Sequence, residues 1–491
     1  MTVWDVLVVL ERNPLEMSIF APVNLRHKID KRLFHVISEV SSQMGVETYA
    51  VGGMVRDIIL GRNNKDFDFV TIGNGLALAE ACAKVLQVKK VTFYKNYGTA
   101  AFHYRGNDIE FVGARKESYR PESRNPTVEP GTLEEDQLRR DFTINAMAID
   151  LHPDRFGHLV DPFQGMADLE TKTIQTPTDP DITFSDDPLR MMRAVRFAAQ
   201  LGFTIAPHCL EAITRNAHRL SIISQERITT ELNKIILSKK PSVGFALLFD
   251  TGLLHLFFPE MIKLHGVSKR EGFAHKDNFY HTLEVLDNVA DQSNDLWLRW
   301  AAILHDIAKP PTKRFESGIG WTFHGHEDLG ARMVPKIFER MKLPLDTTMK
   351  FVQKMVQLHL RPIALTKTEV SDSALRRLLF DAGDDIDALM MLCKADITSK
   401  NELKVKKYLK NYEHVIEKLV ALEEKDRVRN FQPPVSGELI MATFDLQPCS
   451  QVGTIKNAIK DAILDGVIEN DVQQAHQFML KLGADLGLQA V

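Results

Sequence analysis

Two aspartates separated by one residue, Asp66 and Asp68, have the types and spacing of a metal site. They lie in the alternating run KDFDFVTIG, which predicts a strand whose two carboxylates share one face while Phe67 and Phe69 point into a core. Carboxylates held side by side repel each other unless a cation lies between them. Mg²⁺ prefers carboxylate oxygens together with substrate phosphates. The pattern therefore favours a magnesium site, although solvated turns and strand edges often carry the same spacing.

Residues around this strand extend the candidate site toward a phosphate ligand. Gly52 and Gly53 precede a predicted helix, and glycines at a helix N-terminus let an anion approach the backbone. Arg56 lies in the first turn of that helix, where its guanidinium could bind a phosphate. Glu110 alternates with apolar residues in the predicted strand NDIEF and is a candidate third carboxylate. The alternatives are a plain strand–turn–helix with a surface Arg56–Asp57 pair, and a solvated glutamate.

A second group of charged residues opens another predicted helix. Asp187 can cap the N-terminus of this helix, and proline is tolerated in a first turn. Arg190, Arg193 and Arg196 follow at three-residue steps, which places them along one broad helix face. Because three arginines on one face repel one another, we do not expect them in a stable core. The alternative to a ligand-binding face is a solvated one.

Histidines and aspartates in the second half of the chain form a third candidate site. His281 lies on a predicted helix, the pair His305-Asp306 follows the apolar run WAAIL, and Asp396 comes later. Neutral imidazoles with carboxylates suit a divalent transition metal, and a buried aspartate without a partner is costly. Lys309 is either a phosphate contact or solvated. Further histidines that could bind a second metal are His324, His326 and His359.

The elements that must position these residues change character along the chain. The pattern predicts helices over residues 31–43, 54–60 and 76–87. It predicts strands over residues 47–51, 65–73, 91–104 and 107–115. Strands and helices mixed in this way predict a small α/β domain. From about residue 168 the strand signal fades and helical runs continue to the chain end. A linker is expected at 263–278, a break at 429–437, and a loosely attached leader over 1–30.

Composition limits the class of protein. The chain has 491 residues, enough for about three domains, with 44% hydrophobic and 26% charged residues. These values exclude a disordered chain, a collagen-like chain and a small disulfide scaffold. The net charge of −4 means that any nucleic acid must be held by a local basic patch. The four cysteines form no CxxC pair, and no apolar run reaches the roughly 18 residues of a membrane span, so a cytoplasmic location is expected.

Five ordered sequence blocks carry a family resemblance. The segment VGGMVRDIILGRNNKDFDFVTIG resembles the signature of DNA polymerase beta-type nucleotidyltransferases. It is most similar to that of the class II bacterial tRNA nucleotidyltransferase/poly(A) polymerase family. Asp186 stands where this family usually has glutamate, which shortens one side chain by a methylene. The matching blocks after the first are LRRDFTINAMAID (138–150), DPFQGMADLETKTI (161–174), DDPLRMMRAVRFAAQLGF (186–203) and the segment 224–236.

The resemblance implies roles for particular side chains. Asp66, Asp68 and Glu110 would be the catalytic carboxylates, with Mg²⁺ held by the two aspartates. The 3′-hydroxyl of an RNA would attack the α-phosphate of a nucleotide, and pyrophosphate would leave. Asp187 and Arg190 would meet the base edge and select cytosine or adenine. The other nucleotide-binding residues implied are Gly53 and Arg56 for the triphosphate, Arg139 and Arg140 for the nucleotide, Asp141 and Asn145 for the sugar or a local turn, and Arg193 and Arg196 on the base-reading helix.

The order of His281, His305, Asp306 and Asp396 resembles the H…HD…D pattern of the HD phosphohydrolase superfamily. The expected architecture is therefore an α/β nucleotidyltransferase head of the polymerase beta type over 31–150 and an all-α neck that reads base and RNA over 151–265. An all-α HD region over 266–430 and a helical tail over 431–491 follow. A lysine run near the start of the 400–428 helix is a candidate RNA contact or a solvated face, and comprises Lys404, Lys406, Lys407 and Lys410.

The function that the resemblance implies is template-independent addition of CMP and AMP to the 3′ end of tRNA. The substrates would be tRNA, CTP and ATP, with Mg²⁺ in the head and a divalent transition metal in the HD site. Three alternatives remain open: a poly(A) polymerase or A-adding enzyme of the same family, a metal-dependent phosphohydrolase with a non-catalytic head, and a non-catalytic RNA-binding protein. No membrane partner is expected, and the sequence leaves the oligomeric state open.

Overall fold

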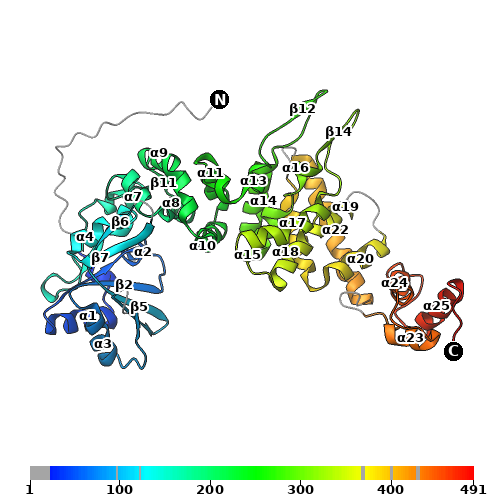
Figure 1. Cartoon of the computed structure of the whole chain (residues 1–491), viewed down its shortest axis with the longest axis horizontal. Helices are drawn as coiled ribbons and strands as arrows, with labels where there is room; N and C mark the ends of the chain where they lie inside the picture. The colour runs from blue at the N-terminus through cyan, green and yellow to red at the C-terminus, as the bar shows by residue number, and fades with distance from the viewer. Residues whose placement is uncertain (1–22, 95–97, 121–122, 366–370, 399–401, 427–431) are drawn as a thin grey trace. The chain divides into compact units, whose positions relative to one another are not determined.

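The computed structural model describes residues 23–94, 98–120, 123–365, 371–398, 402–426 and 432–491 (Figure 1). Most of the predicted leader and the start of the predicted break at 429–437 lie outside these residues. The chain divides into two compact units. The first comprises residues 1–190 and 203–216, and the second comprises residues 191–202 and 217–491.

A seven-stranded mixed sheet forms the centre of the first unit, and its order is β3-β4-β5-β2-β1-β8-β9. Strands β2 and β5 run parallel with Asp68 opposite Glu110, whereas the other neighbours in this sheet are antiparallel. The strand bounds are β1 (Glu47–Val51), β2 (Asp66–Ile72), β3 (Thr92–Tyr94), β4 (Thr99–Tyr104), β5 (Asn107–Gly113), β8 (Ala148–Asp150) and β9 (Leu159–Val160).

Aromatic side chains form the core beneath one face of this sheet. Phe34 of α1 (Arg32–Gln43) packs edge-on against Phe67 and Phe69, with ring centroids 5.9 and 5.8 Å apart. Phe69 in turn stacks on Phe111 of β5 at 5.2 Å. Helix α3 (Gly75–Val85) contacts β4 and β5. Because Phe67 and Phe69 are buried as expected, strand alternation turns the two aspartates of β2 to the opposite face.

The first unit differs from the sequence-based expectation in two places. The predicted single strand at 91–104 is two antiparallel strands, β3 and β4, and Gly98 between them has a φ of 61° that suits a turn. Residues 115–120 and 123–130 form an antiparallel pair that was not predicted, β6 (Arg115–Arg120) with β7 (Ser123–Pro130). The remaining elements of this unit are η1 (Arg26–Lys28), α2 (Gly53–Leu60), α4 (Leu133–Leu138), α5 (Thr143–Ala146), η3 (Pro153–Arg155), α6 (Gly165–Glu170), β10 (Thr173–Ile174), α7 (Pro180–Asp186), β11 (Thr204–Ile205) and α9 (Pro207–Asn216).

Helices build the second unit, which begins within α8 (Leu189–Leu201). Two short hairpins interrupt them, β12 (Lys269–Arg270) with β13 (Phe273–Ala274) and β14 (Arg314–Glu316) with β15 (Gly320–Thr322). The first hairpin lies in the predicted linker at 263–278. After α8, the helices of the second unit as far as Asp426 are η4 (Ala217–Ile222), α10 (Gln225–Ile236), α11 (Pro241–Asp250), α12 (Leu253–Phe257), α13 (Pro259–Ile262), α14 (Asn278–Ala290), α15 (Leu296–Leu304), α16 (Lys309–Thr312), α17 (His326–Arg340), α18 (Thr347–Leu358), α19 (Leu360–Leu365), α20 (Asp372–Ala382), η5 (Gly383–Asp385), α21 (Ile386–Asp396) and α22 (Glu402–Asp426).

A buried arginine ties several of these helices together. The guanidinium of Arg299 on α15 donates to Ile236 O at 2.7 Å and Ser238 O at 2.8 Å, at the end of α10. It also donates to Ala290 O at 3.1 Å and Ser293 O at 3.0 Å, at the end of α14. Carbonyls at helix C-termini lack partners within the helix, and a cation favours that end of the helix dipole. Arg299 is 1% exposed and thus satisfies these carbonyls inside the core.

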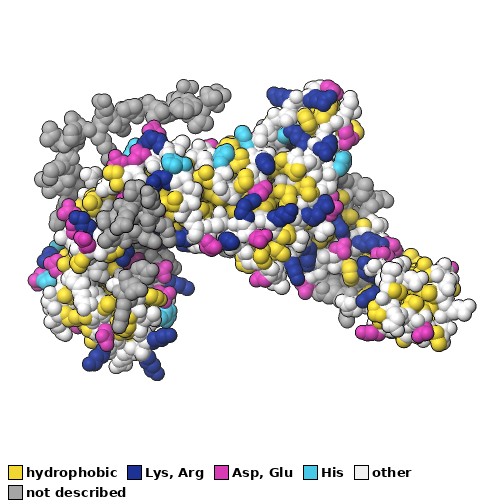
Figure 2. Space-filling model, viewed as in Figure 1, with side chains coloured by type: hydrophobic (Ala, Val, Ile, Leu, Met, Phe, Trp, Pro, Cys, Tyr) yellow, Lys and Arg dark blue, Asp and Glu magenta, His cyan; other side chains and the backbone are white. Residues whose placement is uncertain are grey.

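Three helices at the C-terminus have a small core of their own. They are α23 (Gly437–Phe444), α24 (Ser450–Leu464) and α25 (Val472–Asp485), around Phe444, Ile459 and Met479. Figure 2 shows hydrophobic side chains on the visible surface of this region. Val467, between α24 and α25, is 70% exposed. Among the helices of the described residues, none is both long and apolar enough to cross a membrane. The expected α/β head followed by helical regions is confirmed, and the two hairpins of the second unit are additions to it.

Candidate functional site

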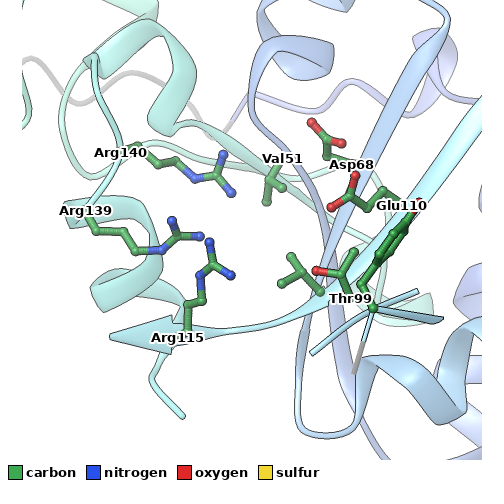
Figure 3. Close-up of a pocket in the computed structure, with 9 residues that line it drawn as sticks. Val51, Asp68, Thr99, Glu110, Arg115, Arg139 and Arg140 are labelled. Carbon is green, nitrogen blue, oxygen red and sulfur yellow. The ribbon is translucent and has the colours of Figure 1, made fainter. Parts of the chain in front are cut away.

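Two carboxylates and three guanidiniums face each other in a cavity of about 510 Å³ in the first unit. Figure 3 shows Asp68 and Glu110 on one side and Arg115, Arg139 and Arg140 on the other. The acids belong to neighbouring parallel strands in direct register. Arg115 is the first residue of β6, and the other two arginines follow α4. The cavity is lined by Val51, Asp68, Tyr94, Thr99, Glu110, Val112, Arg115, Arg139 and Arg140.

The electrostatics of the acids are those of a site that needs a cation. Burial raises the pKa of Asp68, and the nearby charge of Asp66 raises it further while Arg140 opposes both. Burial also raises the pKa of Glu110, with Asp68 as the next cause. Asp66 lies exposed at the start of β2 and is outside the cavity lining, although its charge acts on both acids. Oxygen donors that repel one another in a partly buried site fit Mg²⁺.

Gly52 permits a close approach between the two sides of the cavity. Its φ of 78° lies in the left-handed region, which favours glycine. A Cβ at this position would lie 3.0 Å from Arg140 Nη1 and 3.6 Å from Asp68 Oδ2. Gly53, the predicted phosphate contact, begins α2, and a Cβ there would lie 3.4 Å from Arg56 Nη2. Of the two glycines, Gly52 is therefore the one beside the cavity acids.

Arg56 lies in a buried polar network and not in the cavity lining. It is 8% exposed and donates to Asp57 through Nε at 2.9 Å and Nη2 at 3.0 Å. Its Nη1 donates to Asn145 Oδ1 at 2.7 Å, and Asn145 Nδ2 donates to Asp141 Oδ1 at 3.0 Å. Asp141 also accepts from the backbone N–H of Phe142 at 2.9 Å. These contacts agree with the local-turn alternative for Asp141 and Asn145, and the Arg56–Asp57 pair is buried where the sequence suggested a surface pair.

The arginines of α8 are more buried than the repulsion argument predicted. Asp187 Oδ1 accepts from Leu189 N at 3.1 Å, so the predicted cap is confirmed. Arg190 is 9% exposed and donates through Nη2 to the carbonyl of Arg139 at 2.7 Å. In the second unit, Arg196 is also 9% exposed and pairs with Glu231 at 2.9 Å.

The expectation that these arginines avoid the core is therefore wrong for Arg190 and Arg196. A backbone carbonyl and a buried carboxylate supply the acceptors that the repulsion argument left out. Arg193 lies with its guanidinium 5.5 Å from the Phe197 ring centroid.

The second unit brings the predicted histidines and aspartates together. His281 on α14 lies 2.9 Å from Asp396 Oδ1 at the end of α21, measured from Nε2. His305 Nε2 lies 3.2 Å from Asp306 Oδ2, directly after α15. Lys309 Nζ lies 2.5 Å from the same Asp306 oxygen. Burial lowers the pKa of His305, but the charges of Asp306 and Asp396 outweigh it and raise that pKa to about 10.

Two further histidines approach the other oxygen of Asp306. His326 Nε2 lies 3.2 Å and His359 Nε2 lies 3.8 Å from Asp306 Oδ1. Two groups of ligand atoms, each within 4.8 Å, result: His281, His305 and Asp396, and Asp306, His326 and His359. His324 is not part of them, since its side chain is 86% exposed and faces Glu316.

The orientation of the imidazoles fits a metal. His305, His326 and His359 each engage a backbone carbonyl through Nδ1, at 2.7, 2.8 and 2.7 Å. Their Nε2 atoms point to the cluster, are buried, and make no hydrogen bond in the described structure. Buried nitrogens without partners are costly, and a metal ligated by Nε2 with Nδ1 held by a carbonyl is a common arrangement. The donor set of imidazoles and carboxylates suits a divalent transition metal.

Residues that sequence reasoning missed support both sites. Asp136 is fully buried and pairs with both Arg139 and Arg140. Arg115 enters the cavity from a strand pair that was not predicted. Residues five positions apart face opposite sides of a regular strand, so the sequence pattern gave no signal for Arg115. A cavity of about 410 Å³ lies beside the histidine cluster, with Lys276, Lys309, Phe323 and Tyr408 among its lining residues.

Three family models match the chain in order. The Poly A polymerase head domain matches residues 48–175, the "Probable RNA and SrmB-binding site of polymerase A" matches 202–264, and the HD domain matches 278–400. The A-adding tRNA nucleotidyltransferase of Deinococcus radiodurans is 31% identical over 446 residues, which cover 87% of this chain and 94% of that protein. The Multifunctional CCA protein of Pseudomonas fluorescens is 34% identical over 61% of this chain and 72% of its own length.

Solved structures share the fold. The Bacillus stearothermophilus CCA-adding enzyme in complex with CTP superposes with a TM-score of 0.64 at 23% identity, covering 93% of this chain and 99% of that one. The Thermotoga maritima CCA-adding enzyme complexed with tRNA gives 0.60 at 19% identity, over 94% and 99% of the two chains. Together with the acid pair, the facing arginines and the histidine–aspartate cluster, these likenesses show that the chain belongs to the class II CCA tRNA nucleotidyltransferase/poly(A) polymerase family with an HD domain.

Proposed function

We propose that the chain adds CMP and AMP to the 3′ end of tRNA without a template, using CTP and ATP and releasing pyrophosphate. The observation that carries this proposal is the cavity in which Asp68 and Glu110 face three arginines. Carboxylates on one wall and guanidiniums on the other suit a Mg²⁺–triphosphate ligand, whose metal and phosphates require opposite charges. The family membership restricts the acceptor to the 3′ end of an RNA.

In this proposal Asp66 and Asp68 would hold Mg²⁺, with Glu110 as the third catalytic carboxylate. The bound ion would neutralise charge on the phosphates and lower the pKa of the attacking hydroxyl. The three arginines of the cavity, Arg115, Arg139 and Arg140, bind the triphosphate and orient its α-phosphate toward the acids. Their guanidiniums also favour the negative charge that grows as pyrophosphate leaves. Gly52 keeps the two walls close, since any side chain there would meet Arg140.

Base selection is proposed for Asp187 and Arg190. The Asp187 side chain caps α8, and Arg190 in the first turn of that helix donates to the carbonyl of Arg139, which lines the cavity. A carboxylate and a guanidinium together offer acceptors and donors for the edge of cytosine or adenine. Arg56, Asp141 and Asn145 are proposed to hold the turn beside the nucleotide, with Gly53 as a further contact. The division into a head (31–150), neck (151–265), HD region (266–430) and tail (431–491) remains part of the proposal.

The test is incorporation of labelled CTP or ATP into tRNA that lacks its last three, two or one nucleotides, with Mg²⁺. The proposal expects C, C and A in that order from one chain. Asp68→Asn and Glu110→Gln should each lower the rate by about a thousandfold or more, because each removes a carboxylate on which charge stabilisation depends. Glu80→Gln, an exposed acid on α3 of the same unit, is the control and should leave the rate unchanged. Normal CCA addition by Asp68→Asn would refute the proposed site.

A-addition alone is a second candidate, and a specific observation favours it. The relative from Deinococcus radiodurans is an A-adding tRNA nucleotidyltransferase, and it matches this chain over 94% of its own length. The same assay separates the two functions. An A-adding enzyme extends tRNA that already ends in CC with ATP and leaves tRNA lacking all three nucleotides unextended. Long ATP-dependent tails would indicate a poly(A) polymerase.

We also propose a metal-dependent phosphohydrolase activity for the HD region. The support is the set of buried imidazole nitrogens directed at Asp306. A bound divalent transition metal would supply Lewis-acid chemistry toward a phosphate ester. Asp306 and Asp396 bring the negative charge that retains the ion, and Lys309 lies where it can contact a phosphate. His305→Ala should abolish hydrolysis of phosphomonoesters and weaken Mn²⁺ or Ni²⁺ binding in calorimetry. Loss of tRNA extension in His305→Ala but not in Asp68→Ala would show that the head is not the catalyst.

A further inference from the structure

A single buried carboxylate holds the two arginines that follow α4. Asp136 Oδ1 accepts from Arg139 through Nε at 3.0 Å and Nη2 at 2.6 Å. Asp136 Oδ2 accepts from Arg140 through Nε at 3.2 Å and Nη2 at 2.9 Å. Each guanidinium thus presents the same edge to its own carboxylate oxygen. Two hydrogen bonds along one edge fix the plane of a guanidinium as well as its position.

This arrangement solves a problem of like charges. Arg139 and Arg140 are adjacent in sequence and both line the cavity, so their guanidiniums repel each other. Asp136 is fully buried and pairs with both of them, so the two guanidiniums and the carboxylate together carry a net charge of +1. Although burial raises the pKa of Asp136, the two arginines outweigh burial and hold that pKa below its ordinary value. Asp136 is therefore ionised at neutral pH.

The carboxylate itself is firmly anchored. Helix α4 begins with a capping box between Thr132 and Glu135. Gln137, the next residue after Asp136, donates through Nε2 to Ala146 O at 2.7 Å and Val160 O at 3.1 Å, which attaches the helix to the sheet region. The fixed point for both arginines is thus part of the sheet scaffold.

The guanidiniums of both arginines face the acids across the cavity, and Arg140 has a nitrogen near Asp68. A Cβ at Gly52 would meet Arg140 Nη1 at 3.0 Å and Asp68 Oδ2 at 3.6 Å, so this nitrogen lies beside the catalytic carboxylate. Figure 3 shows Arg139 and Arg140 extending into the cavity toward Asp68 and Glu110.

From this geometry we infer that Asp136 is a positioning residue for nucleotide binding: it orients Arg139 and Arg140 so that their outer nitrogens receive the phosphates of the incoming nucleotide. The inference rests on the proposed function of the head. It adds a residue that touches neither substrate nor metal, yet sets where the triphosphate binds.

Two physical effects of Asp136 act in opposite directions, which makes the inference testable. As a negative charge near the cavity, Asp136 weakens the attraction of an anionic nucleotide. As an anchor, it strengthens binding by holding the guanidiniums in place. Neutralising Asp136 should therefore tighten nucleotide binding if only charge matters, and weaken it if positioning dominates. An asparagine keeps one acceptor oxygen but replaces the other with an NH₂ group that cannot accept from an arginine.

The experiment measures the Kd of ATP and of CTP for Asp136→Asn by calorimetry, without tRNA and with Mg²⁺, alongside KM and kcat for tRNA extension. We expect both Kd values and both KM values to rise about tenfold, because one two-bond contact to a phosphate-binding arginine is lost. The ATP-to-CTP ratio should not change, since the phosphates are common to both nucleotides. Glu134→Gln removes the same charge from an exposed position of the same helix and should leave every value unchanged.

Kd values that stay the same or fall in folded Asp136→Asn overturn the inference. If Asp136→Asn lacks a cooperative thermal transition, Asp136→Glu decides, because it keeps the charge but moves both guanidiniums forward by one methylene. Its Kd for ATP should rise about threefold, and an unchanged Kd overturns the inference. Failure of nucleotidyl transfer in the head gives a different result, because the wild-type chain would then incorporate neither ATP nor CTP into tRNA.

Discussion

Asp68→Asn should abolish nucleotidyl transfer and at the same time stabilise the first unit in the absence of divalent ions. Asp68 lies opposite Glu110 on the neighbouring strand, and burial and the charge of Asp66 hold its pKa above the ordinary value. Asparagine has nearly the shape of the protonated acid but none of the charge. The substitution therefore removes a repulsion that the folded chain otherwise bears whenever no metal is bound.

The size of the effect follows from the sheet geometry. Neighbouring strands lie about 4.8 Å apart, so two carboxylates in register are about 5 Å apart. At an effective dielectric constant between about 20 and 40, their repulsion is about 1.5–3 kcal/mol. The attraction of Asp68 to Arg140 opposes part of it. A net gain of about 1 kcal/mol is expected, which raises the melting temperature of a unit of this size by about 2–4 °C.

Thermal unfolding followed by circular dichroism in EDTA, from pH 4 to pH 8, is the assay. The sign follows from linkage. Because the folded-state pKa of Asp68 is raised, its contribution to stability is fully present below the ordinary value near 3.8 and is lost as the pH rises through the raised pKa. The gain from Asp68→Asn should therefore be present at pH 7 and disappear near pH 4. Added Mg²⁺ should stabilise the wild-type chain more than the variant.

Glu80→Gln, on the exposed side of α3, is the matched control and should change the melting temperature by less than about 1 °C at any pH. A lower melting temperature for Asp68→Asn than for wild type at pH 7 in EDTA would refute the view that the acid pair is held together against repulsion.

Three further predictions concern the second unit. Arg299→Met should lower the free energy of unfolding of the second unit by about 3–5 kcal/mol, because it leaves helix-end carbonyls buried without a donor. The control Arg340→Met breaks an exposed pair with Glu260 and should cost about 1 kcal/mol or less. Urea unfolding monitored by tryptophan fluorescence compares the two variants, and equal costs would contradict the role of Arg299. Mn²⁺ or Ni²⁺ should raise the melting temperature of the metal-free wild-type chain, and His326→Ala should reduce that rise. An equal rise in the wild-type chain and in His326→Ala would exclude His326 as a ligand. Gly483→Ala should destabilise the C-terminal helices by about 1–3 kcal/mol despite the better helix propensity of alanine, because the new Cβ would lie 2.2 Å from Phe444 Cζ. Hydrogen exchange in α23–α25 measures the loss of protection. Unchanged protection would show that Phe444 can move aside.

The part of the site that depends on strand periodicity could be predicted from the sequence. Alternation alone places Phe67 and Phe69 in the core and the aspartates on the other face, and the structure confirms that burial. Four members of the histidine–aspartate cluster could be predicted from their resemblance to the H…HD…D pattern: His281, His305, Asp306 and Asp396. The sequence did not distinguish its other members, His326 and His359, from the exposed His324.

What could not be predicted depends on partners far apart in the chain. Arg56 lies in the first turn of a glycine-led helix, which suggests a phosphate contact, but Asn145 lies 89 residues away and holds it in a buried network. Arg196 pairs with Glu231, and no helix or strand spacing in the sequence predicts that contact. Sequence periodicity assigns a side chain to a face, whereas only the packing of other elements decides whether an acceptor already occupies that face.

The parallel pairing of β2 and β5 has a consequence for how this head can vary among descendants. The ladder alone sets Asp68 opposite Glu110, so the length of the crossover between the two strands has no influence on their alignment. Insertions within residues 73–106 but outside α3, β3 and β4 should therefore be tolerated without loss of activity, whereas Tyr94 of β3 and Thr99 of β4 line the cavity. Deletion of Phe67 would instead make the two aspartates adjacent and turn one of them to the wrong side of the sheet, because side chains alternate along a strand.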